Sequence, residues 1–130
     1  MKASTQEWLN FAREDLMNCE LILSEEYLTN IVAFHSQQVL EKAFKALIDE
    51  KGLNIPRVHN LQRLYDIIDK FLDEKFDTEI LVLLDSVYTN SRYPGDIGII
   101  KSGKPTLQES KELFEGAKKI FIIILKTLES

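Results

Sequence analysis

Apolar residues recur at the three- and four-residue spacing of an α-helix along nearly the whole chain. This spacing predicts a first helix over about residues 5–24 and a second over about residues 28–51. Ser4 and Glu7 form the sequence pattern of a capping box at the start of the first helix. Gly52 follows the second helix at the position where a helix commonly ends.

Three more helices follow from the same periodicity. They are predicted over about residues 61–72, 79–90 and 107–128. Asn60 is the predicted N-cap of the first, Asp77 or Thr78 that of the second, and Thr106 with Glu109 forms a capping box for the third. The short connections between them predict an all-α, up-and-down bundle of four or five helices.

The two last predicted helices contain the runs I-L-V-L-L and I-F-I-I-I-L. Such runs also occur in β-strands, but no alternating partner strand lies nearby in the sequence. In addition, Leu113, Phe114 and Ala117 precede Ile120 at helical spacing. Successive helical residues differ by about 100°, so these runs place apolar side chains on more than one side of each helix. We expect a homodimer through one or both helices, with burial in the centre of the monomer as the alternative.

Size and composition predict one domain over residues 1–130. The chain is 45% hydrophobic and 28% charged, and no apolar run approaches the roughly 20 residues that span a bilayer. We therefore expect no membrane association. A single cysteine, Cys19, forms neither an internal disulfide nor a multi-cysteine zinc site, and the first residues lack the apolar stretch of a signal peptide. A cytoplasmic protein is expected.

The histidines give no sign of a metal site. His35 and His59 are far apart in sequence, and neither has a second histidine or a carboxylate pair at ligand spacing. We expect neither a metal nor a cofactor.

The net charge of −5 opposes indiscriminate nucleic-acid binding, which needs an excess of Lys and Arg. This average conceals a pattern. Residues 31–60 and 91–105 have more basic than acidic side chains, and they contain His35, His59 and Arg92. The positive segments are therefore candidates for binding an anion.

Residues 98–105, G-I-I-K-S-G-K-P, nearly match a phosphate-binding loop. Such a loop needs Ser or Thr after its lysine and a strand before its glycines, whereas Pro105 follows Lys104 and no strand is predicted. Residues 95–105 are better interpreted as a flexible connection between helices, in which Lys101 and Lys104 add positive charge near a bound anion.

His35, Gln38 and Lys42 lie at i, i+3 and i+7, which places them along one stripe of a largely apolar helix. One interpretation is a solvated face with a hydrogen-bonded histidine. The other is the wall of a ligand pocket, to which Arg92 supplies a bidentate guanidinium for phosphate and Tyr93 a ring for stacking on a base.

Three segments together resemble the HEPN family, the "higher eukaryotes and prokaryotes nucleotide-binding" domains. They are F-H-S-Q-Q-V-L-E-K-A-F-K-A-L-I at 34–48, V-H-N-L at 58–61 followed by L-Y-D-I-I, and S-R-Y-P at 91–94. The resemblance implies a helical bundle that is usually dimeric and often encoded beside a minimal nucleotidyltransferase. It also implies roles in nucleotide or RNA binding and in toxin–antitoxin pairs.

Many members of that family are metal-independent ribonucleases with an arginine followed four to six residues later by a histidine. This sequence departs from the pattern, because Ile97, Gly98 and Ile99 occupy the corresponding positions after Arg92. A ribonuclease would need His35 or His59 to approach Arg92 in space. His59 also has a structural interpretation, because it precedes the predicted cap Asn60.

Three hypotheses remain open. The chain is a nucleotide- or RNA-binding module acting through His35, Gln38, Lys42, Arg92 and Tyr93, with His59, Lys101 and Lys104 as auxiliary residues. Alternatively it is a ribonuclease toxin with unusual residues, or a structural dimerisation domain. In the last case Arg92 pairs with an acid such as Asp85 or Asp96.

Overall fold

The computed structural model describes residues 1–92 and 104–130, with the backbone alone for residues 89–92. These residues form five α-helices, joined in part by two short 3-10 turns, η1 (Glu26–Leu28) and η2 (Asp69–Phe71). The helices are α1 (Ala3–Ile22), α2 (Thr29–Glu50), α3 (Leu61–Ile68), α4 (Glu79–Arg92) and α5 (Leu107–Glu129). The predicted all-α bundle is confirmed.

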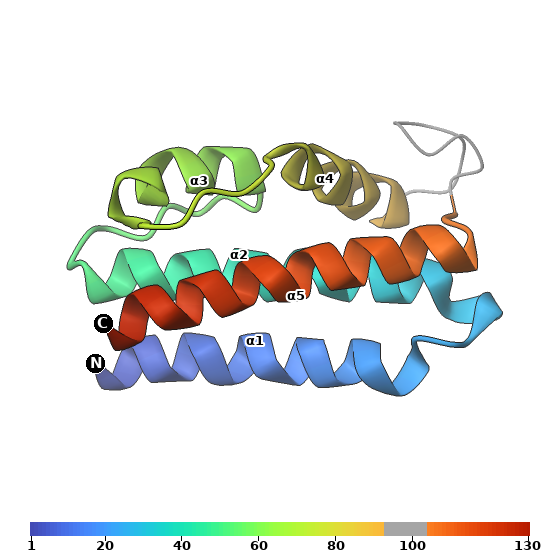
Figure 1. Ribbon diagram of the computed structural model, residues 1–130, viewed down its shortest axis with the longest axis horizontal. Coiled ribbons are helices and arrows are strands. Elements are labelled where there is room, and N and C mark those ends of the chain that lie inside the picture. The colour runs from blue at the N-terminus through green and yellow to red at the C-terminus, as the bar shows by residue number, and fades with distance from the viewer. Residues whose placement is uncertain (93–103) are drawn as a thin grey trace.

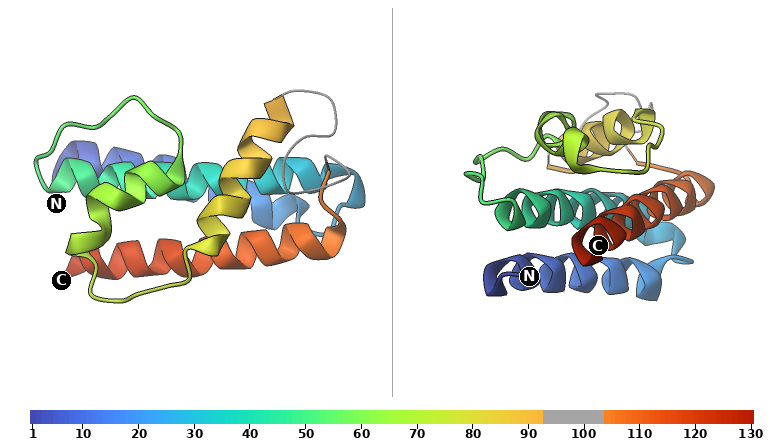
Figure 2. Two further views of the ribbon diagram at one scale, coloured as in Figure 1. Left: turned by 90° about the horizontal axis from the view of Figure 1, so that it is seen from above. Right: turned by 60° about the vertical axis from the view of Figure 1, so that its left-hand side comes forward.

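The helices lie in three layers (Figure 1). The long helices α2 and α5 form the middle layer, α1 covers one side, and α3 with α4 cover the other (Figure 2). α2 contacts all four other helices and contributes many of the fully buried side chains, among them Leu40, Phe44 and Leu47. The core therefore surrounds α2.

Three of the predicted caps form. The side chain of Asn60 accepts a hydrogen bond from the backbone N–H of Arg63 at 2.9 Å. Asp77 accepts one from the N–H of Glu79, the first residue of α4, at 3.0 Å. Thr106 and Glu109 form the complete capping box at the start of α5. Caps depend on residues close together in sequence, which explains why the sequence predicts them well.

The predicted capping box of Ser4 and Glu7 is wrong. α1 begins at Ala3, and its N-cap residue, Lys2, makes no side-chain cap. Contacts with α2 hold this end instead, because Glu50 accepts hydrogen bonds from the Lys2 N–H at 2.9 Å and the Thr5 hydroxyl at 3.1 Å. A tertiary contact thus replaces the expected local one.

The apolar run of α5 is mostly buried within the monomer. Phe121, Ile123 and Ile124 lie in the core, whereas Ile122 is exposed. The middle position of α5 explains this burial, since it packs against both α2 and α4. Burial in the monomer therefore accounts for most of the run, and the homodimer stays a prediction. None of the described helices has both the length and the apolarity needed to cross a bilayer.

Candidate functional site

The predicted stripe of His35, Gln38 and Lys42 is on the side of α2 that runs between α1 and α4. His35 and Lys42 contact Asp15 of α1, and Phe34, next to His35, stacks on Tyr88 of α4. All three predicted side chains are partly exposed. We call these three residues the α2 stripe.

Asp15 joins two members of the α2 stripe. One carboxylate oxygen lies 2.7 Å from His35 Nδ1, and the other accepts a hydrogen bond from Lys42 Nζ at 2.5 Å. The Asp15 side chain is only 8% exposed, whereas His35 and Lys42 are 27% and 25% exposed. A carboxylate can only accept, so Nδ1 of His35 carries the proton and Nε2 is the acceptor of the neutral ring. The cluster therefore holds an ammonium and an oriented imidazole side by side.

A second cluster surrounds Glu41, one turn from Gln38. Glu41 accepts hydrogen bonds from Lys45 Nζ at 3.0 Å and from the Gln38 amide at 3.2 Å, and its carboxylate lies 2.9 Å from His59 Nδ1. Gln37 donates to the backbone oxygen of His59 at 2.8 Å. These contacts agree with the structural interpretation of His59, since they fix the segment that leads into α3.

Aromatic rings connect the two clusters. Tyr88 stacks on Phe34 with ring centroids 5.6 Å apart, and on the His59 ring with centroids 5.4 Å apart. Phe34 also meets His35 edge-on, at 5.5 Å. The site thus combines flat rings with cationic and imidazole groups, which is the combination that recognises bases and phosphates.

The remaining predicted residues are only partly described. Arg92 ends α4, one turn beyond Tyr88, and its side chain lies outside the described residues, as do Tyr93 and Lys101. α4 crosses α2 at an angle, and its C-terminal end lies on the side of α2 away from α5 (Figure 2, left). Lys104 donates to the Tyr27 backbone oxygen at 2.7 Å and lies over the Tyr27 ring, at η1.

The predicted flexible connection at 95–105 falls largely outside the described residues, and so does Asp96, one of the two acids proposed to pair with Arg92. The other acid, Asp85, accepts a hydrogen bond from the backbone N–H of Leu61 at 2.8 Å and so holds the start of α3. Its pairing with Arg92 stays a prediction.

The sequence interpretation missed Asp15, Glu41, Phe34 and Tyr88. Asp15 had a detectable signal, because a carboxylate stands among the apolar positions Ala12 and Cys19 of the first helix and is buried with them. Glu41 and Lys45 had another, the i, i+4 spacing of an ion pair. Tyr88 had none, since its position beside α2 depends on how α4 crosses that helix.

The electrostatics of the site are balanced. Asp15 and Glu41 offset Lys42 and Lys45, so an incoming phosphate must compete with Asp15 for Lys42. Near this cluster the pKa of Cys19 is raised to about 11, mainly by burial, with a smaller contribution from the charge of Asp15. The thiol therefore stays protonated at neutral pH, which makes it a poor nucleophile.

Comparisons with known proteins agree with this architecture. A HEPN domain family model matches residues 5–128. The crystal structure of TT1696 from Thermus thermophilus superposes with a TM-score of 0.80 at 24% identity, over 97% of this chain and 99% of that one. That of ST0689, an archaeal HEPN homologue, gives a TM-score of 0.69 at 27% identity, over 97% and 98%. A search of curated proteins gives no match.

Proposed function

Since the chain belongs to the HEPN domain family, we propose that it is a nucleotide- or RNA-binding module and that its ligand binds on the α2 stripe. One observation carries this proposal. Asp15 holds His35 and Lys42 together beside the stacked rings of Phe34 and Tyr88. Ammonium and imidazole suit a phosphate, and partly exposed aromatic rings suit an unstacked base.

Each residue has a defined role in this proposal. Lys42 acts as a point charge on a phosphate, and His35 contacts the same phosphate or the ribose through Nε2. The Gln38 amide contacts a base edge. Arg92 contributes a bidentate guanidinium from the end of α4, and Tyr93 a ring for stacking. His59, Lys101 and Lys104 are auxiliary.

We extend the proposal to the partners that the family suggests. The chain acts with a minimal nucleotidyltransferase, as one half of a toxin–antitoxin-like pair, and forms a homodimer. Exposed apolar side chains on the outer helices support a dimer, because Phe11, Met17 and Leu21 of α1 are each more than half exposed. A groove of about 330 Å³ between α1 and α5 adds apolar surface beside Met17 and Ile122.

Titration with labelled RNA tests the binding site. Fluorescence anisotropy is measured for a short single-stranded RNA, and competition with ATP tests for a free nucleotide. Lys42→Ala and Arg92→Ala should each weaken binding about tenfold, the loss of one charge-assisted contact. Lys119→Ala, at an exposed position on α5, is the matched control and should leave the affinity unchanged. Wild-type affinity in both Lys42→Ala and Arg92→Ala would overturn the proposal.

A second candidate is a metal-independent ribonuclease, favoured by the carboxylate-oriented imidazole of His35. In this reaction His35 Nε2 accepts the proton of the ribose 2′-hydroxyl as that oxygen attacks the phosphorus, and the 5′-oxygen leaves with a proton from a second donor. Purified protein would then cleave RNA in EDTA, and His35→Ala would abolish the cleavage. RNA binding without any cleavage by a clean preparation would exclude this candidate.

A further inference from the structure

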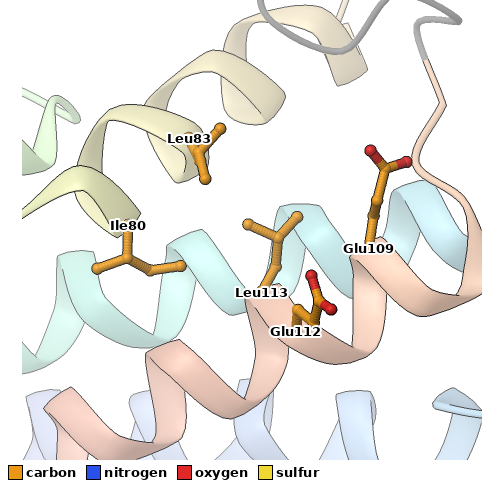
Figure 3. A pocket seen from close by; sticks show the side chains of 5 residues that line it. All are labelled: Ile80, Leu83, Glu109, Glu112 and Leu113. Carbon is orange, nitrogen blue, oxygen red and sulfur yellow. The ribbon is translucent and has the colours of Figure 1, made fainter.

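A small pocket lies between α4 and α5 and shares no residue with the α2 stripe. Its volume is about 170 Å³. Ile80 and Leu83 of α4 and Leu113 of α5 supply its apolar wall, and Glu109 and Glu112 of α5 supply two carboxylates (Figure 3). The pocket therefore combines an aliphatic surface with two acidic groups.

The packing of the two helices creates this pocket. Gly116 allows α4 to approach α5 closely, because a Cβ there would lie 2.9 Å from Ile80 Cδ1. From this contact α4 crosses away from α5 (Figure 2, left). The space beside Leu113, about one turn before Gly116, is consequently left unfilled by either helix.

The two carboxylates face the pocket from the first turns of α5. Glu109 accepts a hydrogen bond from the Thr106 N–H at 2.7 Å, and Glu112 accepts one from the Gln108 side-chain amide at 2.9 Å. Figure 3 shows Glu112 next to Leu113, and Glu109 farther along α5 toward its start. The N-terminus of a helix carries roughly half a positive charge, which two carboxylates outweigh. The pocket is therefore suited to a cation.

Size limits what the occupant can be. Small-molecule sites usually enclose roughly 300–1,000 Å³, so about 170 Å³ has room for one long side chain rather than for a nucleotide. The carboxylates also repel phosphate. Arginine buries an aliphatic stem on apolar surface while its guanidinium binds carboxylates, and it is common among the residues that anchor protein interfaces.

We propose that this pocket binds an arginine side chain from a partner protein. The stem packs on Ile80, Leu83 and Leu113, and the guanidinium lies between Glu109 and Glu112. Charge complementarity is the basis for the choice of occupant, since among the described residues that line the pocket three are apolar and the two polar ones are acidic. The surface is separate from the α2 stripe, so partner and nucleotide can be bound at the same time.

Methyl NMR with a minimal probe tests this proposal. The probe is the tripeptide acetyl-Gly-Arg-Gly-amide, and its counterpart has citrulline, a neutral isostere, in place of arginine. We expect the arginine peptide to shift the methyl signals of Ile80, Leu83 and Leu113, and the citrulline peptide to bind at least about fivefold more weakly. Equal shifts with both peptides, or shifts at other methyl groups only, would overturn the proposal.

Variants and alternative ligands complete the test. Glu112→Gln should remove the preference for arginine, whereas Glu115→Gln, an exposed position on the same helix, should keep it. Two results would refute an arginine from another protein as the occupant. One is a change in the same methyl signals on dilution of the protein alone, which indicates a second copy. The other is a shift of these signals by AMP.

Discussion

Asp15 and Glu41 each hold a lysine and a histidine beside the α2 stripe, but the two clusters differ in their access to water. The two partners of Asp15, His35 and Lys42, are each about a quarter exposed. Lys45, the cationic partner of Glu41, is only 8% exposed. A carboxylate, a lysine and a histidine therefore form an open cluster at Asp15 and a more closed one at Glu41.

This difference in exposure predicts which cluster serves ligand binding and which serves stability. A ligand can reach an ammonium only where water can reach it, so Lys42 is available to a phosphate and Lys45 is not. Of the two side chains that pair with Glu41, Lys45 is buried and His59 is exposed, with 57% of its side chain accessible. Removing one member of a buried ion pair leaves the other charge uncompensated, which is strongly destabilising. The closed cluster should therefore matter more for stability, and the open one for binding.

The largest expected effect is on stability at the closed cluster. Glu41→Gln should lower the free energy of unfolding by about 3 kcal/mol, because it leaves the Lys45 ammonium buried without a counter-charge. Urea denaturation followed by circular dichroism measures the change. Glu115→Gln is the control and should stay within about 0.5 kcal/mol of the wild type.

Asp15→Asn should destabilise less, by about 1–2 kcal/mol, because water can solvate Lys42 and His35 after the carboxylate is gone. The same denaturation experiment measures it, with the exposed neighbour Glu14→Gln as the control. A loss larger than that of Glu41→Gln would show that the exposure of the partners does not determine stability here.

Binding should change in opposite directions within the open cluster. Asp15→Asn removes the anion that competes with a phosphate for Lys42, so it should tighten RNA binding about tenfold, whereas Lys42→Ala should weaken it. Glu41→Gln should change the affinity of the folded protein less, because Glu41 pairs with Lys45 and not with Lys42. Anisotropy titrations at a fixed salt concentration measure all three. Weaker binding by Asp15→Asn would place the phosphate elsewhere.

The smallest effect is a change in the pKa of Cys19. Burial raises this pKa to about 11, and the charge of Asp15 contributes to the increase. Asp15→Asn should therefore lower the pKa of Cys19, and Glu41→Gln should not. The pH dependence of the carbon NMR shift of Cys19 Cβ measures it in the folded protein, where the buried thiol is closed to alkylating reagents. The same pKa of Cys19 in both variants would contradict a contribution from the charge of Asp15.

The raised pKa of Cys19 also links stability to pH. A folded-state pKa above the unfolded value stabilises the protein fully below about pH 9, the ordinary pKa of a thiol, and this contribution is lost as the pH rises toward about 11. Cys19→Ser, which does not titrate in this range, should flatten the fall in melting temperature between pH 9 and 11. An unchanged slope would mean that other groups cause the alkaline loss.

Much of the fold could be predicted because its determinants are local. Helical periodicity gave all five α-helices, and short-range polar patterns gave the caps at Asn60, Asp77 and Thr106. The capping box predicted at Ser4 did not form. The helix begins at Ala3 instead, and Glu50 of α2 accepts a hydrogen bond from the Lys2 N–H just before it. There a contact across the fold outweighed a local pattern.

The site was harder to predict for the same reason. The spacing of His35 and Lys42 correctly placed both on one stripe, because that relation lies within one helix. Their shared partner Asp15 comes from another helix, and Tyr88 comes from α4. Sequence spacing cannot give these pairings, which depend on how whole helices pack.

The central position of α2 has a consequence for the dynamics of the protein. Because α2 contacts all four other helices, the buried residues in its middle cannot reach solvent until most of the bundle has separated. The backbone amides of Val39, Leu40 and Ala43 should therefore exchange their hydrogens with solvent only through global unfolding. The floor of the proposed binding site would then be its most rigid part, and any adjustment to a ligand would come from α1, α4 and the side chains at the rim.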